Sequence, residues 1–325
     1  MASNLATFLF SRRPDVAISE LGWTLASGAT ANALEGGDQI SAKILDADES
    51  AIAILNDGTI DAGAGDDLIT GTVTGEAGGV GIYNDIAGLL TTAAGSDVIM
   101  GISTTGYGII NFSTIDTGLG ADAITGIGES GPGIDNSGRI DTGAGRDSIS
   151  GISTGVAVGL VNITIEASAT IRMGAGSDII AATSFTGVAI YNTGRIDTGS
   201  GHDTVTAFST NNQAILNDGV INLGAGRDTL DAVAGGFAGT GTTLLGDGSD
   251  LLTGFGSGYF DGGSGRDRIL FSEGVYAIAG TTIISGGNTM HVSRFEQLGG
   301  LNGGLFKFAD GVLTVDAFGV ATFEA

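Results

Sequence analysis

One short motif recurs along the chain and restricts the folds that this sequence can adopt. It is a Gly-rich turn, then an aspartate, then an aliphatic residue two positions later, and its most regular copy, G-x-G-x-D-x-I, spans residues 143–149. The aspartates that mark the copies are Asp38, Asp67, Asp97, Asp122, Asp147, Asp178, Asp203, Asp228, Asp250 and Asp267. Their spacings are 29, 30, 25, 25, 31, 25, 25, 22 and 17 residues, a period near 25. This period is typical of a repeat protein, in which each unit buries its apolar face only against its neighbours.

Three aliphatic positions in each repeat predict three short strands. The first lies two residues after each aspartate and is Ile, Val or Leu in all ten copies, whereas the residue between them varies freely. This alternation is typical of a strand with one buried face. A second register has an asparagine two residues after an aliphatic residue, at Asn56, Asn84, Asn111, Asn136, Asn162, Asn192 and Asn217. In most repeats a third aliphatic residue follows four positions later, at Ile60, Ile115, Ile140, Ile196 and Ile221.

We therefore predict an all-β fold, a single right-handed parallel β-helix (β-solenoid) of about 9–10 coils. Right-handedness is the usual choice for such connections. Residues 36–270 form the coils, residues 1–35 an N-terminal cap, and residues 271–325 a β-rich C-terminal cap. Caps are expected because an open terminal coil would expose unpaired strand edges. We expect the asparagine side chains to hydrogen-bond to one another along the stack.

Composition and charge exclude several classes of function. The formal net charge is -24, with only 12 Lys and Arg, which argues against nucleic acid as a partner and favours cations. There is no cysteine, so disulfides and thiolate metal sites are excluded. No apolar run approaches the ~20 residues of a membrane span, so we expect no membrane insertion. The apolar residues 5–10 precede Arg12 and Arg13, the reverse of the order in a secretory signal.

The aspartates should form a column that attracts a divalent cation. Coils stack at about 4.8 Å, so like residues lie above one another and a column of carboxylates repels itself. A cation midway between two such oxygens is about 2.4 Å from each, which suits Ca²⁺ better than Mg²⁺. The ten motif aspartates are thus predicted metal ligands, with a second set six residues earlier at Asp61, Asp116, Asp141, Asp197 and Asp261. The alternative is that these aspartates only accept hydrogen bonds from their own turns.

One segment carries a family resemblance. Residues 262–270, GGSGRDRIL, match the calcium-binding nonapeptide G-G-x-G-x-D-x-U-x, so the chain resembles the RTX (hemolysin-type) proteins. Residues 291–300 look like the segment that often follows the last such repeats. The resemblance implies calcium binding and type I secretion through an uncleaved C-terminal signal in residues 271–325. It therefore implies a secreted or cell-surface location.

The sequence departs from the RTX pattern in its spacing. RTX nonapeptides follow one another directly, whereas here one copy occurs in each ~25 residues and the other corner carries asparagine. We therefore expect a wider, three-sided helix with calcium along at most one edge. The asparagine corner resembles the ladders of pectate-lyase-like β-helices.

Three functions remain open at this stage. The first is a non-enzymatic structural or cell-surface protein (fibre, sheath, matrix or adhesion component), with end-to-end self-association into filaments and surface glycans as possible partners. Stacking and ion binding account for the recurrent residues, so no catalytic residue is predicted. The second is a polysaccharide lyase, hydrolase or epimerase-like enzyme that uses unrepeated groups such as Glu76, Asp85, Glu166 and Arg172. The third is a calcium-bound module that carries the C-terminal region through secretion.

Overall fold

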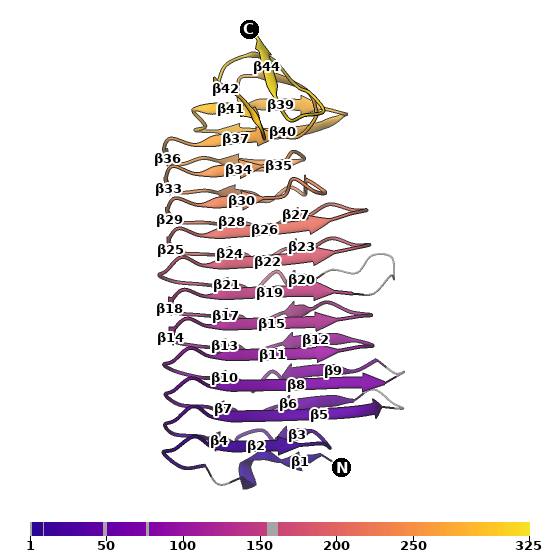
Figure 1. The fold of residues 1–325 in the computed structure, drawn as a ribbon, viewed down its shortest axis with the longest axis vertical. Coiled ribbons are helices and arrows are strands. Elements are labelled where there is room, and N and C mark those ends of the chain that lie inside the picture. Colours follow the sequence, from indigo (N-terminus) through magenta and orange to yellow (C-terminus); the bar gives the residue numbers. More distant parts are fainter. Residues whose placement is uncertain (1, 9, 48–50, 76–77, 155–161) are drawn as a thin grey trace.

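The computed structural model describes residues 2–8, 10–47, 51–75, 78–154 and 162–325. Three parallel sheets run along the molecule, and each coil as far as β31 adds one strand to each sheet (Figure 1). Sheet 1 contains β1 (Ser3–Asn4), β3 (Trp23–Leu25), β6 (Ile52–Asn56), β9 (Val80–Asn84), β12 (Tyr107–Asn111), β16 (Ile134–Asn136), β20 (Ile163–Ile165), β23 (Ile190–Asn192), β27 (Ile215–Asn217) and β31 (Phe237–Ala238).

Sheet 2 receives the next strand of each coil and ends in the C-terminal antiparallel strands. In spatial order it contains β4 (Thr30–Asn32), β7 (Thr59–Asp61), β10 (Leu89–Thr91), β13 (Thr114–Asp116), β17 (Arg139–Asp141), β21 (Thr170–Arg172), β24 (Arg195–Asp197), β28 (Val220–Asn222), β32 (Thr242–Leu244), β35 (Gly258–Asp261), β40 (Asn288–Ser293), β39 (Thr282–Ser285), β38 (Gly274–Ala279), β43 (Gly311–Val315) and β44 (Ala321–Glu324).

A strand of sheet 3 begins directly after each motif aspartate. Sheet 3 contains β2 (Val16–Ser19), β5 (Gln39–Ala47), β8 (Leu68–Gly75), β11 (Val98–Ser103), β15 (Ala123–Gly128), β19 (Ser148–Ser153), β22 (Ile179–Ser184), β26 (Thr204–Ser209), β30 (Thr229–Asp231), β34 (Leu251–Thr253), β37 (Arg268–Phe271), β41 (Gln297–Gly300) and β42 (Gly303–Lys307). The Gly turns add the short strands β14 (Leu119–Gly120), β18 (Ala144–Gly145), β25 (Ser200–Gly201), β29 (Ala225–Gly226), β33 (Asp247–Gly248) and β36 (Ser264–Gly265).

The core consists of aliphatic columns, because equivalent residues of successive coils pair in register. Ile99 of β11 lies opposite Ile69 and Ile124, and its side chain is fully buried. The columns of sheets 1 and 2 are built in the same way, as at Ile109 and Ile115. Each coil therefore covers the apolar face of the next. The predicted all-β solenoid is confirmed, with about eleven turns rather than 9–10.

The additional turn comes from the N-terminal segment. The sequence predicts a cap at residues 1–35, but β2, β3 and β4 pair in parallel with β5, β6 and β7 and form a coil of their own. A 3₁₀ helix, η1 (Leu5–Thr7), buries Leu5 completely against this coil, and Phe8 and Phe10 pack on the same cluster. The sequence did not reveal this coil because it lacks the Gly-rich turn.

The C-terminal segment covers the other end. β40 and β41 still pair in parallel with the last coils, whereas β38, β39, β42, β43 and β44 pair antiparallel with their neighbours (Figure 1). Tyr276, Ile278 and Leu313 of this segment are buried in the continuous core. Among the described residues, no helix is long and apolar enough to cross a membrane.

Candidate metal site: the aspartate column

A Gly-rich turn precedes each motif aspartate and directs its side chain toward the inside of the solenoid. Gly143 has a φ of 81°, and a Cβ at this position would lie 1.8 Å from the carbonyl oxygen of Gly118 in the preceding coil. Only glycine fits this close approach of two backbones. The aspartate that follows, Asp147, is 1 % exposed, and all ten motif aspartates are buried to a similar extent.

One oxygen of each carboxylate links its coil to the preceding coil. The backbone N–H of Asp147 donates to Oδ1 of Asp178 at 2.8 Å, and the N–H of Asp122 donates to Oδ1 of Asp147 at 3.0 Å. The same bond joins every successive pair from Asp38 to Asp267, at 2.7–3.0 Å. The ten predicted residues therefore form a continuous column.

Two further carboxylates, absent from the sequence prediction, extend this column at its ends. Asp15 donates its N–H to Oδ1 of Asp38 at 2.6 Å, and Asp267 donates its N–H to Oε2 of Glu296 at 2.6 Å. Both acidic residues stand two positions before a buried apolar residue, Ala17 and Leu298, which is the spacing of the motif. Neither follows a G-x-G turn, so the repeated motif does not reveal them.

The second oxygen of each motif aspartate has no partner. Oδ2 is buried without a hydrogen bond in all ten. Threonine hydroxyls lie close to several of these aspartates and lower their pKa. These hydroxyls, however, donate to main-chain carbonyls of the next coil, as Thr92 does to Thr117 at 3.2 Å. Burying an unpaired carboxylate oxygen costs free energy, and a proton or a cation bound at Oδ2 would reduce that cost in each motif coil.

Burial accordingly raises the pKa values of the column. Desolvation is the main cause, the hydrogen bond from the neighbouring backbone N–H opposes it, and charges on adjacent carboxylates add to it. The pKa rises to about 7 for Asp67, Asp178 and Asp228, and to about 6 for Asp97, Asp147 and Asp267. It is also raised for Asp38, Asp122, Asp203 and Asp250.

The donor set fits calcium in chemistry but supplies few ligands per ion. Carboxylate and carbonyl oxygens are the ligands that Ca²⁺ prefers, and Ca²⁺ takes six to eight of them. Each coil offers one unpaired carboxylate oxygen. Among the described residues, no three or more His, Cys, Asp or Glu side chains are grouped so that they could hold a metal ion. Main-chain carbonyls and water would have to complete any coordination sphere.

The second predicted set of aspartates lies apart from the column. Asp61, Asp116, Asp141, Asp197 and Asp261 end strands of sheet 2. Oδ1 of Asp61, Asp141 and Asp261 accepts the N–H of the residue two positions later, at 3.1–3.2 Å. Asp141, Asp197 and Asp261 also form ion pairs, with Arg139, Arg195 and Arg294 respectively. In Asp261 the hydrogen bonds from Arg294 lower the carboxyl pKa. These contacts are those of turn-forming, ion-paired carboxylates.

Asparagine side chains hydrogen-bond to one another in two separate runs, and Oδ1 of Asn192, which begins the second run, is buried without a partner. Asn84 Nδ2 donates to Oδ1 of Asn111 at 2.8 Å, and the same bond joins Asn56 to Asn84, Asn111 to Asn136 and Asn192 to Asn217. The prediction of Asn162 as a ladder member is wrong. Ile165 lies between Asn136 and Asn192, while Asn162 precedes β20 and its amide is buried without a partner. The longer repeat of 31 residues shifts the register at this coil.

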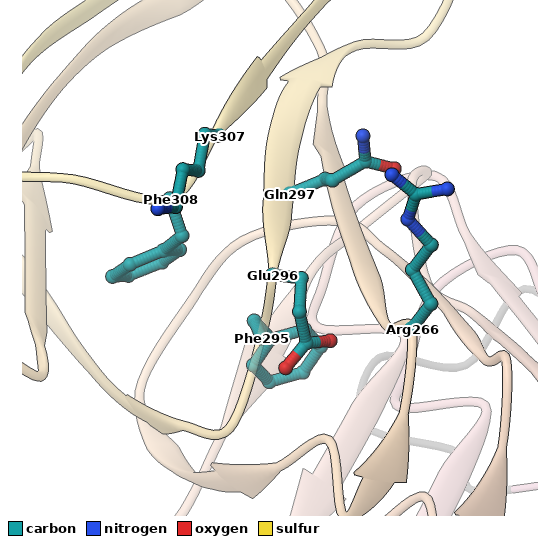
Figure 2. Close-up of a pocket in the computed structure, with 6 residues that line it drawn as sticks. All are labelled: Arg266, Phe295, Glu296, Gln297, Lys307 and Phe308. Carbon is teal, nitrogen blue, oxygen red and sulfur yellow. The ribbon is translucent and has the colours of Figure 1, made fainter.

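The C-terminal end of the column borders a surface cavity. Arg266, Phe295, Glu296, Gln297, Lys307 and Phe308 line a hollow of about 440 Å³. Figure 2 shows Glu296 between Arg266 on one side and Lys307 on the other. The last carboxylate of the column therefore lines an open hollow that also contains two cationic residues, whereas the ten motif aspartates are enclosed within the solenoid.

The residues considered for an enzyme are dispersed. Arg172 of β21 lies opposite Asp141 and Asp197 on sheet 2. Asp85 and Glu166 occupy turns between sheets 1 and 2, three coils apart. Glu76 lies outside the described residues.

The fold and its stacked aspartates place the chain in the class of parallel β-solenoids with coils of about 25 residues. No family model matches the chain, and no curated protein matches it either. A solved structure that does match is a hyperactive, Ca²⁺-dependent, β-helical antifreeze protein from an Antarctic bacterium, at 18 % identity and a TM-score of 0.37. The match covers 82 % of this chain and 88 % of that one. Similarity this low carries no argument about ligand or activity, and the RTX resemblance stays a prediction.

Proposed function

We propose that this protein is a non-enzymatic, secreted or cell-surface β-solenoid with a structural role, whose aspartate column binds calcium. The observation that carries the proposal is the unpaired, buried Oδ2 present in all ten motif aspartates. A buried carboxylate cannot remain both ionised and unpaired at little cost. The repetition of this feature in every motif coil indicates a property of the whole rod rather than a single reactive centre.

Two neutralising partners compete for these oxygens. With pKa values near 6 to 7 in several members, protons neutralise part of the column at neutral pH when no metal is bound. Calcium would replace those protons above that pH, with the aspartates holding the ion and main-chain oxygens or water completing its shell. Extracellular calcium modules bind with Kd values of about 10⁻⁴–10⁻³ M, an affinity that limited carboxylate ligation can supply.

Calcium titration of the EGTA-stripped chain at pH 7.5, followed by isothermal calorimetry and thermal melting, tests the proposal. We expect several ions per chain and a rise in the melting temperature. Asp147→Asn should lower the bound stoichiometry, because the amide keeps the Oδ1 acceptor but places a neutral group at the unpaired position. Asp141→Asn is the matched control, since Asp141 is ion-paired in sheet 2 and should leave the stoichiometry unchanged. A stripped protein that is folded and binds no calcium at millimolar concentration would contradict the proposal.

A further inference from the structure

One face of the solenoid is free of charge. It consists of the outward side chains of six consecutive sheet-3 strands, β8, β11, β15, β19, β22 and β26, whose buried residues alternate with outward ones. We call it the sheet-3 face. Its members are Leu68, Thr70, Thr72, Val98, Met100, Ile102, Ala123, Thr125, Ile127, Ser148, Ser150, Ile152, Ile179, Ala181, Thr183, Thr204, Thr206 and Phe208.

This neutrality is specific to sheet 3. The chain has 48 charged residues, 36 acidic and 12 basic, yet none of the eighteen positions holds one. Over the same coils, the outward positions of sheet 2 hold Asp61, Asp116, Arg139, Asp141, Arg172, Arg195 and Asp197. Sheet 1 holds Asp135 in its outward row. Charge has therefore been kept off one face of a strongly acidic molecule.

The sheet-3 face is also regular and large. Its strands pair in parallel and in register with no bulge among them, and Figure 1 shows them stacked one above another. Each outward residue occupies about 4.8 Å across the strands and about 6.6 Å along them, so eighteen residues cover roughly 570 Å². Two such faces would bury about 1,100–1,200 Å², close to the lower limit of a specific interface.

A charged residue lies next to each end of the sheet-3 face, and the two charges are opposite. The next strand toward the N-terminus, β5, carries exposed Lys43, and the next strand toward the C-terminus, β30, carries Asp231. Both lie in outward positions, Lys43 beside Thr72 and Asp231 beside Thr206. The sheet-3 face thus has a cationic side chain at one end and an anionic side chain at the other.

We propose that the sheet-3 face is the interface between two copies of this chain, packed face to face with their long axes antiparallel. A two-fold axis parallel to the strands, midway between β15 and β19, exchanges β5 with β30. It places Lys43 of each copy over the coil of Asp231 in the partner. The two side chains stand one outward position apart, about 6.6 Å along the strand, which a lysine side chain spans.

A second copy suits this face better than an oppositely charged partner. Each chain carries a formal charge of -24, so two copies repel wherever their acidic faces meet. On the sheet-3 face no like charges oppose each other. Charged residues such as Glu129, directly after β15, lie at the rim, as in protein interfaces with an apolar centre and a polar border.

A matched pair of substitutions tests the interface. Thr125→Lys introduces a charge at the centre of the sheet-3 face, and Thr114→Lys makes the same change on sheet 2 in the same coil. We expect sedimentation equilibrium to show a dimer of 32.1 kDa chains for the native protein and for Thr114→Lys. Thr125→Lys should raise the dimer Kd at least tenfold with an unchanged circular dichroism spectrum. Equal Kd values for the two variants, or a native protein that is monomeric at high concentration, would overturn the proposal.

Charge exchange tests the orientation. Lys43→Asp and Asp231→Lys should each weaken the dimer, because each places like charges together at both ends of the interface. The double variant, Lys43→Asp with Asp231→Lys, should recover most of the native Kd. If the double variant dimerises more weakly than either single variant, the antiparallel arrangement is wrong. Measuring in calcium and again in EGTA separates this proposal from ion binding, since the sheet-3 face contains no column residue.

Discussion

Aspartate and asparagine each form a stacked column in this solenoid, at different corners of the coil, and their side chains differ in how they hydrogen-bond along the stack. An asparagine side chain has both a donor and an acceptor, so Asn84 accepts from Asn56 and donates to Asn111. An ionised aspartate has only acceptors. Asp147 therefore takes its one donor from the backbone of Asp122 and leaves Oδ2 unpaired. Within each run of the asparagine ladder the side chains pair with one another, and only Asn192 Oδ1, next to the interruption at Ile165, lacks a partner. In the aspartate column every motif residue leaves one oxygen unpaired and needs a proton or a cation.

This difference predicts an unusual pH dependence. Several column aspartates have folded pKa values of about 6 to 7, above the ordinary 3.8. Between these values the folded state binds more protons than the unfolded chain, so its stability falls as pH rises from about 4 to 7. In EGTA we expect the melting temperature to be higher at pH 5 than at pH 8, and calcium to remove most of that decline. A melting temperature that rises from pH 5 to pH 8 in EGTA would show that these carboxylates are stabilised as anions without metal.

At the scale of the structural element, the Gly-rich turn makes the column possible. The backbone at Gly143 approaches Gly118 so closely that no side chain fits between the coils. The turn also brings each aspartate inward at the start of a sheet-3 strand. In the following strand, buried and outward residues alternate, so one strand contributes both to the core and to the uncharged sheet-3 face.

Gly143→Ala tests the close approach. The new Cβ would lie 1.8 Å from the Gly118 carbonyl oxygen, so the coils must separate, which should lower the free energy of unfolding by about 1–3 kcal/mol. This loss adds to the conformational penalty of about 1–2 kcal/mol for alanine at the positive φ of Gly143. Gly280→Ala is the control, because Gly280 also has a positive φ, 57°, but nothing lies within 4 Å of its Cβ position. That change should cost only the conformational penalty of about 1–2 kcal/mol. Chemical denaturation measures the free energy of unfolding of both variants. Equal decreases for Gly143→Ala and Gly280→Ala would mean that the turn tolerates a side chain.

At the scale of the whole molecule, the solenoid has two different ends and unlike lateral faces. The first coil is covered in part by η1, Phe8 and Phe10, and antiparallel strands end the molecule. Outward positions of sheet 2 carry charges, whereas the sheet-3 face carries none. End-to-end filaments and binding to surface glycans stay predictions. Lateral pairing through the sheet-3 face is a separate mode of association that buries no terminal strand.

The proposed absence of catalysis is a property of the whole surface and can be tested directly. Among the residues considered for an enzyme, Asp85, Glu166 and Arg172 are dispersed, and the aspartate column is enclosed, so a substrate cannot reach its Oδ2 atoms. We expect no product when the calcium-loaded protein is incubated with uronate-containing and neutral polysaccharides and the reaction is followed by chromatography. Release of oligosaccharides that is retained by Asp147→Asn would point to a catalytic group elsewhere on the coils.

The sequence by itself determined the solenoid, its three strands per coil and the ten-member column, because a residue that recurs once per coil must stack on its own copies. Tertiary structure alone decided how each column is used. Which oxygen of Asp147 faces a donor depends on the backbone of the neighbouring coil, and Asp15 and Glu296 join the column through contacts that no motif records. Asn162 lost its predicted place for a similar reason, since a longer repeat shifts the strand that follows it. Where the repeat length is constant, periodicity fixes which residues share a column. At the ends of the solenoid and at a longer repeat, the packing of one coil on the next decides column membership, and everywhere it decides the partner of each polar atom.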